Sequence, residues 1–141
     1  MNDHPRITNV VSEPMRPAGS PAVLDWLDRQ AASTLFLTGT SLSELMLGAE
    51  ILPAGRRREE LRAGLAELLD TLFDSRILPF DAAAAHAFAR LVAQARSAGR
   101  AISVADGQIA AIATAHGFRV ATRDRAPFEA AGVPVIDPWA E

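Results

Sequence analysis

Three acidic side chains stand where an α/β protein could bring them together at one edge of a sheet. Asp106 falls in the first turn of a helix predicted to start at Ser103, and Asp124 comes just after a predicted strand. Glu44 falls near the start of an earlier predicted helix. Carboxylate oxygens are the ligands that Mg²⁺ and Mn²⁺ prefer, and such an ion can activate water against a phosphodiester. The pattern predicts a divalent-metal site with Glu44, Asp106 and Asp124 as metal ligands and catalytic residues.

Each of these acids also has a purely structural interpretation. Glu44 lies three residues after Ser41, and Asp106 lies three residues after Ser103, which is the spacing of a capping box. Asp124 could cap a short helix over 125–128. Taken one at a time, capping is the commoner role for such residues. Taken together, their positions favour a shared site, because ligands gather beyond the carboxyl ends of parallel strands.

The scaffold is predicted from alternating strand and helix patterns. Strands are expected at 34–38, 77–80, 118–122 and 133–136. Helices are expected from about 20, where Ser20-Pro21 is a start signal, and at 41–51, from 56 onward, at 81–99 and at 103–116. This alternation predicts a mostly parallel sheet covered by helices on both faces. A length of 141 residues fits a single domain, 1–141.

Composition excludes several kinds of chemistry. The chain has no cysteine, so thiolate zinc sites and cysteine nucleophiles are excluded. All fourteen basic residues are arginine, which a GC-rich genome explains most simply, and the missing lysine excludes P-loop and Schiff-base enzymes and receiver domains. The net charge of −3 gives no general attraction for nucleic acid. No apolar run reaches membrane-spanning length and no signal core precedes the domain, so a cytoplasmic location is expected, with no membrane partner.

Six motifs, in order along the chain, resemble one known family. They are 8–14, Ser41-Leu42-Ser43-Glu44-Leu45, 52–58, Ile77-Leu78-Pro79-Phe80-Asp81, Ile102-Ser103-Val104-Ala105-Asp106 and Ala121-Thr122-Arg123-Asp124. The combination is similar to the PIN-domain ribonuclease toxins of the VapC/FitB type, and the resemblance runs from Thr8 almost to the end of the chain.

The resemblance implies an α/β/α sandwich and Mg²⁺-dependent endonuclease activity on RNA. It also implies inhibition by a cognate antitoxin and usually a homodimer. Glu44 and Asp106 match the family's central acids, and Asp124 matches its last acidic position. Thr8 and Asn9 match the polar pair beside the family's first acid. Ser103, at the predicted cap beside Asp106, is the third supporting polar residue.

The chain departs from the family at that first acid, where Ile7 stands in place of an aspartate. The segment 1–7 is atypical, since His4-Pro5-Arg6 replaces an aliphatic run and proline cannot donate in a central strand. Asp3 is too far along the strand to substitute without a shift of register. The alternative to a toxin is therefore an impaired PIN-like protein that binds antitoxin or RNA without cutting. A phosphatase-like hydrolase is disfavoured because the paired-aspartate motif of such enzymes is missing.

Overall fold

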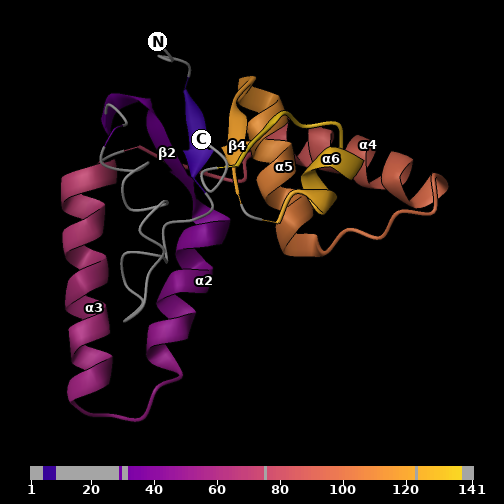
Figure 1. Cartoon of the computed structure of the whole chain (residues 1–141). Coiled ribbons are helices and arrows are strands. Elements are labelled where there is room, and N and C mark those ends of the chain that lie inside the picture. The colour runs from indigo at the N-terminus through magenta and orange to yellow at the C-terminus, as the bar shows by residue number, and fades with distance from the viewer. Residues whose placement is uncertain (1–4, 9–28, 30–31, 75, 123, 138–141) are drawn as a thin grey trace.

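A parallel sheet lies between two groups of helices in the computed structural model, which describes residues 5–8, 29, 32–74, 76–122 and 124–137 (Figure 1). The sheet contains β1 (Arg6–Thr8), β2 (Leu35–Thr38), β3 (Ile77–Leu78), β4 (Arg119–Ala121) and β5 (Val135–Ile136), in the order β3-β2-β1-β4-β5. All four strand pairings are parallel. The predicted sandwich with a mostly parallel sheet is confirmed.

The strand order creates one place where the chain changes direction across the sheet. From β1 the chain steps outward through β2 to β3, and it then returns to the other side of β1 for β4 and β5. Such a switch point, here between β1 and β4, opens a crevice at the carboxyl ends of the two strands. Thr8 and Ala121 are aligned in register at these ends. Any site of an open parallel sheet is therefore expected here.

The two faces of the sheet carry separate apolar cores. On one face pack α4 (Ala82–Ser97), α5 (Val104–His116) and α6 (Ala126–Ala130), around a core that includes Ile7, Ile109 and Phe128. On the other face lie α2 (Gly39–Glu50), α3 (Arg56–Leu68) and the π-helical turn Leu69–Phe73, over a core that includes Leu35 and Leu37. Alternation along a strand explains this division, because neighbouring side chains point to opposite faces.

Helices α4 and α5 form where the sequence predicts them, and each begins at a capping side chain. Asp81 caps α4, its carboxylate accepting a hydrogen bond from the N–H of Ala84 at 3.0 Å. The two helices pack closely at Gly107, where an added Cβ would lie 2.9 Å from Phe88 Cε2 and 3.1 Å from Val92 Cγ2. Glycine at this position therefore permits α5 to approach α4.

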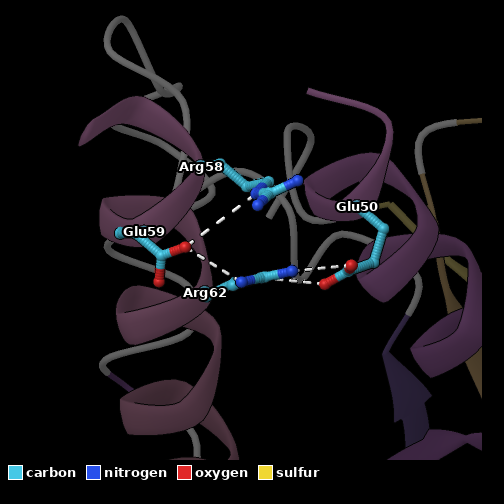
Figure 2. Close-up of polar contacts among 4 residues, drawn as sticks. All are labelled: Glu50, Arg58, Glu59 and Arg62. Atoms are coloured by element: carbon cyan, nitrogen blue, oxygen red, sulfur yellow. Dashed lines mark hydrogen bonds and ion pairs between the residues drawn. The ribbon is translucent and has the colours of Figure 1, made fainter. Parts of the chain in front are cut away.

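Helices α2 and α3 run side by side and extend away from the sheet (Figure 1). An exposed ion-pair cluster joins them, in which Arg62 donates to both oxygens of Glu50 at 2.8 and 2.7 Å and to Glu59 at 2.9 Å (Figure 2). The Arg62 hydrogen bonds hold the pKa of Glu50 below its ordinary value. Arg58 Nε lies 3.9 Å from the same Glu59. Arg56 opens α3 at the predicted start of this helix and is exposed.

The atypical N-terminal segment still supplies the central strand. Arg6 is the first residue of β1, directly after Pro5, and is only 1% exposed between Leu35 of β2 and Arg119 of β4. The helix predicted from residue 20 lies outside the described residues. None of the described helices combines the length and the apolar character needed to cross a membrane.

Candidate functional site

A pocket of about 690 Å³ opens on the face of the sheet that carries α5 and α6. It lies between the loop that leads into α5 and the first residues of α6. Asp106 and Asp124 both line it, so the structure brings two of the three predicted acids to one cavity. The remaining lining residues are Arg100, Ala101, Ile102, Ser103, Ala126, Pro127, Glu129 and Ala130.

Asp106 is held by half of a capping box. Ser103 caps α5, with its hydroxyl accepting a hydrogen bond from the backbone N–H of Asp106 at 3.1 Å. The reciprocal bond, from the N–H of Ser103 to the carboxylate of Asp106, is not formed among the described residues. The predicted box is therefore incomplete, and the half-buried carboxylate keeps its acceptor oxygens for a ligand. The amino end of α5 favours an anion there, because its N–H groups carry partial positive charge.

Asp124 comes soon after β4, and its main chain is hydrogen-bonded to the side chain of Thr122. Its backbone N–H donates to Thr122 Oγ1 at 3.2 Å, and that hydroxyl donates back to the Asp124 carbonyl at 3.5 Å. Helix α6 begins from Arg125 with no side-chain cap, so the interpretation of Asp124 as a helix cap is wrong. The exposed carboxylate of Asp124 has no hydrogen-bond or ion-pair partner within the described part of the chain.

Glu44 does not complete a capping box either. Helix α2 begins at Gly39, two residues earlier than predicted, because Thr38 is its cap and accepts from the N–H of Ser41 at 3.0 Å. Glu44 is therefore in the second turn, one turn beyond Thr40 on the same helix face. Thr40 donates to Gln108 Oε1 at 3.0 Å, which ties this face of α2 to the start of α5. Glu44 is exposed and is not among the residues that line the pocket.

The position of the missing first acid is closed to solvent. Ile7 is 0% exposed and belongs to the core cluster between the sheet and α5. Thr8 points to the opposite face, where it is also fully buried and its Oγ1 has no hydrogen-bond partner among the described residues. Thr8 therefore stays a prediction as a supporting residue, and Asn9 lies outside the described residues.

The carboxylate oxygens of Asp106 and Asp124 are chemically suited to bind a hard divalent cation. Asp106 and Asp124 both line one pocket, and their carboxylates have no hydrogen-bond or ion-pair partner among the described residues. Oxygen donors of this type select Mg²⁺ or Mn²⁺. Within residues 5–8, 29, 32–74, 76–122 and 124–137, no group of three His, Cys, Asp or Glu side chains is arranged to hold a metal. Convergence of Glu44 with the Asp106–Asp124 pair stays a prediction.

Two residues near the acids were missed by sequence reasoning. Gln108 accepts the hydrogen bond that joins α2 to α5, and Arg100 is the cation on the pocket wall. Gln108 could have been found from the helical pattern, since it lies on α5 within one turn of Asp106. No local signal distinguishes Arg100 from the other exposed arginines, because its significance depends on the tertiary position of the loop before α5.

Comparison with known proteins places these features in context. The PIN domain family matches residues 8–133. The chain is 48% identical over 133 residues to the VapC ribonuclease Y4jK of Sinorhizobium fredii, covering 94% of each protein. It is 41% identical over 132 residues to toxin FitB of Neisseria gonorrhoeae, covering 94% of this chain and 95% of FitB. The crystal structure of FitAcB from Neisseria gonorrhoeae superimposes with a TM-score of 0.90 at 38% identity, covering 96% of this chain and 99% of that one.

Proposed function

The chain belongs to the PIN domain family, and on this premise we propose that it is a metal-dependent endoribonuclease that acts as the toxin of a toxin–antitoxin module. One observation carries the proposal: Asp106 and Asp124 line the same pocket, and their carboxylates have no hydrogen-bond or ion-pair partner among the described residues. The similarity to a VapC ribonuclease and to toxin FitB gives the substrate class, RNA, and the biological role.

Asp106 and Asp124 would hold Mg²⁺ or Mn²⁺ through carboxylate oxygens, with Glu44 as the candidate third acid. The ion would supply an activated water and stabilise charge on the phosphodiester. The chain itself provides supports for the two acids: the Ser103 cap holds the first turn of α5, and the Thr122 hydroxyl accepts a hydrogen bond from the backbone of Asp124. Both supports act on the backbone and leave the carboxylates available.

A second function is favoured by the environment of Ile7. An apolar side chain that is 0% exposed supplies no ligand, and it replaces a carboxylate that would add negative charge to the site. The second candidate is therefore a PIN-fold protein with impaired catalysis that binds antitoxin or RNA without cutting. The two candidates differ in one measurable property, the rate of metal-dependent RNA cleavage.

The partner in either case is the cognate antitoxin. Two acidic side chains at an open pocket favour a cationic segment, since opposite charge steers and orients association. Co-purification with the product of the adjacent open reading frame tests this. Asp106→Ala is expected to weaken that complex, and a complex of unchanged affinity would place the contact elsewhere. The homodimer stays a prediction, which the mass of the purified toxin would test.

The decisive experiment is cleavage of a structured RNA by the purified chain with Mg²⁺ or Mn²⁺, beside Asp106→Asn and Ile7→Asp. If the chain is a toxin nuclease, the wild-type protein cuts RNA and the Asp106→Asn variant does not. If the chain is catalytically impaired, the wild-type protein does not cut RNA and the Ile7→Asp variant does. Cleavage that persists in Asp106→Asn would reject the assignment of the pocket as the active site.

A further inference from the structure

We propose that Arg100 binds a backbone phosphate of the RNA beside the cleaved one and so positions the strand across the pocket. This inference rests on the proposed function and adds a substrate-positioning residue to it. Arg100 lies on the wall of the same pocket as Asp106 and Asp124. Its place there, in the loop between α4 and α5, is fixed by a backbone hydrogen bond from its N–H to the carbonyl of Ala95 at 2.8 Å.

The guanidinium of Arg100 is unpaired within the described part of the chain, although carboxylates share its pocket. Glu129, which also lines the pocket, has its Oε1 3.7 Å from Arg125 Nε instead. Asp106 and Asp124 have no cationic partner in the described part of the chain. Other arginines of the chain, such as Arg56 and Arg62, form ion pairs with nearby acids. Among the described residues, therefore, no acid competes with a ligand for the donors of Arg100.

The combination of charges fits a polyanion that must approach an acidic centre. Phosphate is repelled by the two carboxylates unless a metal neutralises them, so a fixed positive charge on the same wall favours the correct approach. A guanidinium can donate two parallel hydrogen bonds to one phosphate. Because all basic residues of the chain are arginine, it is the location of Arg100 and not its residue type that supports this role.

The size of the pocket also agrees with this role. About 690 Å³ lies within the range that holds small-molecule ligands, and the lining reaches from the two acids to Arg100. In this proposal one phosphate of the strand lies near the acids and a neighbouring phosphate lies near Arg100. On this arrangement Arg100 is a positioning residue, since it contacts a phosphate that does not react.

The test measures RNA affinity separately from cleavage. A fluorescent single-stranded RNA is titrated with full-length protein in the Asp106→Asn background at several salt concentrations, with and without Arg100→Ala. Arg90→Ala is the matched control, because Arg90 is an exposed arginine of α4 that does not line the pocket. Thermal melts of all variants verify folding.

Loss of one phosphate contact should weaken binding about tenfold at low salt. It should also reduce the slope of log K against log salt by about 0.7, the value for one contact on a single strand. Arg90→Ala should change neither quantity appreciably. Arg100→Lys should restore the salt slope, because lysine also carries a positive charge. It should restore only part of the affinity, because lysine cannot form the bidentate contact. In an active background, Arg100→Ala should raise KM more than it lowers kcat.

Several results would overturn the inference. Equal effects of Arg100→Ala and Arg90→Ala would mean that Arg100 acts only through net charge. Unchanged RNA affinity with weaker antitoxin binding would assign Arg100 to the protein partner. The absence of RNA binding in every variant would also reject it. Absence of cleavage by the wild type, with RNA binding that still depends on Arg100, would reject only the catalytic part of the proposed function.

Discussion

Replacing Asp106 with asparagine separates a helix-capping role from a metal-binding role. The hydrogen bond that caps α5 joins Ser103 Oγ to the backbone N–H of Asp106, so asparagine retains it. The carboxylate itself has no partner among the described residues, so no side-chain hydrogen bond is lost. Two effects on the free energy of unfolding remain. Loss of the charge near the amino end of α5 removes a favourable interaction with the helix dipole, about 0.3–1 kcal/mol. Loss of the same charge also relieves repulsion from Asp124, which stabilises the variant.

We therefore expect Asp106→Asn to change the metal-free stability by less than about 0.5 kcal/mol, or roughly 2 °C in Tm. Ser103→Ala is the matched control, since it removes the cap itself and should cost about 1 kcal/mol. Metal at about ten times its Kd should stabilise the wild type and Ser103→Ala by about 1.4 kcal/mol. The same metal should leave Asp106→Asn unchanged.

The measurement is a set of thermal melts with and without Mg²⁺ or Mn²⁺, paired with RNA cleavage. Where the wild type is inactive, the same comparison is made in the Ile7→Asp background. The reasoning would be refuted by an Asp106→Asn protein that melts as low as Ser103→Ala and still cuts RNA. That result would assign Asp106 to the cap and not to the metal.

Three further predictions concern the supporting structure. Ile7→Asp should lower the free energy of unfolding without metal by at least about 3 kcal/mol, because a buried apolar side chain becomes a buried carboxylate. In urea unfolding, Mg²⁺ should stabilise this variant more than it stabilises the wild type. Equal stabilisation of the two proteins would show that position 7 does not face the metal. Gly107→Ala should lower stability by about 1 kcal/mol, since contact with Phe88 outweighs the better helix propensity; a more stable variant would show that the ring moves aside. Glu50→Gln should lower the Tm slightly at pH 7 and by less at pH 3. The pair with Arg62 depresses the pKa of Glu50, so its stabilisation is present above the ordinary value of 4.5 and disappears as the pH falls through the lowered value; an equal difference at both pH values would contradict this.

Local patterns were sufficient to predict most of the scaffold. The cap at Asp81 and the left-handed Gly117 at the end of α5 lie where the sequence signals them, because each depends only on residues within one turn. Helix α2 was predicted two residues late. Two hydroxyl residues, Thr38 and Ser41, are both good caps, and the end of β2 decides between them through tertiary contacts.

Sequence patterns were sufficient to single out the two acids that line the pocket, but not to predict how they are arranged, and their role as metal ligands stays a prediction. Positions at element ends identified Asp106 and Asp124, because the carboxyl edge of a parallel sheet collects such residues. The location of Glu44 relative to them depends on the packing of α2 against α5, which is a contact across many residues of sequence. The burial of Ile7 likewise depends on the neighbours of β1, which only the strand order supplies.

The contrast between α5 and the α2–α3 pair has a consequence for amide hydrogen exchange. Residues 109–113 of α5 are at most 1% exposed, so their amides should exchange only when the whole domain unfolds. The far ends of α2 and α3 are joined by exposed ion pairs, and Leu47 and Ile51 there are 60% and 72% exposed. Amides in this region should exchange through partial openings that become more frequent as salt screens the ion pairs. Asp106 would then stay on a rigid helix while the other side of the molecule opens and closes.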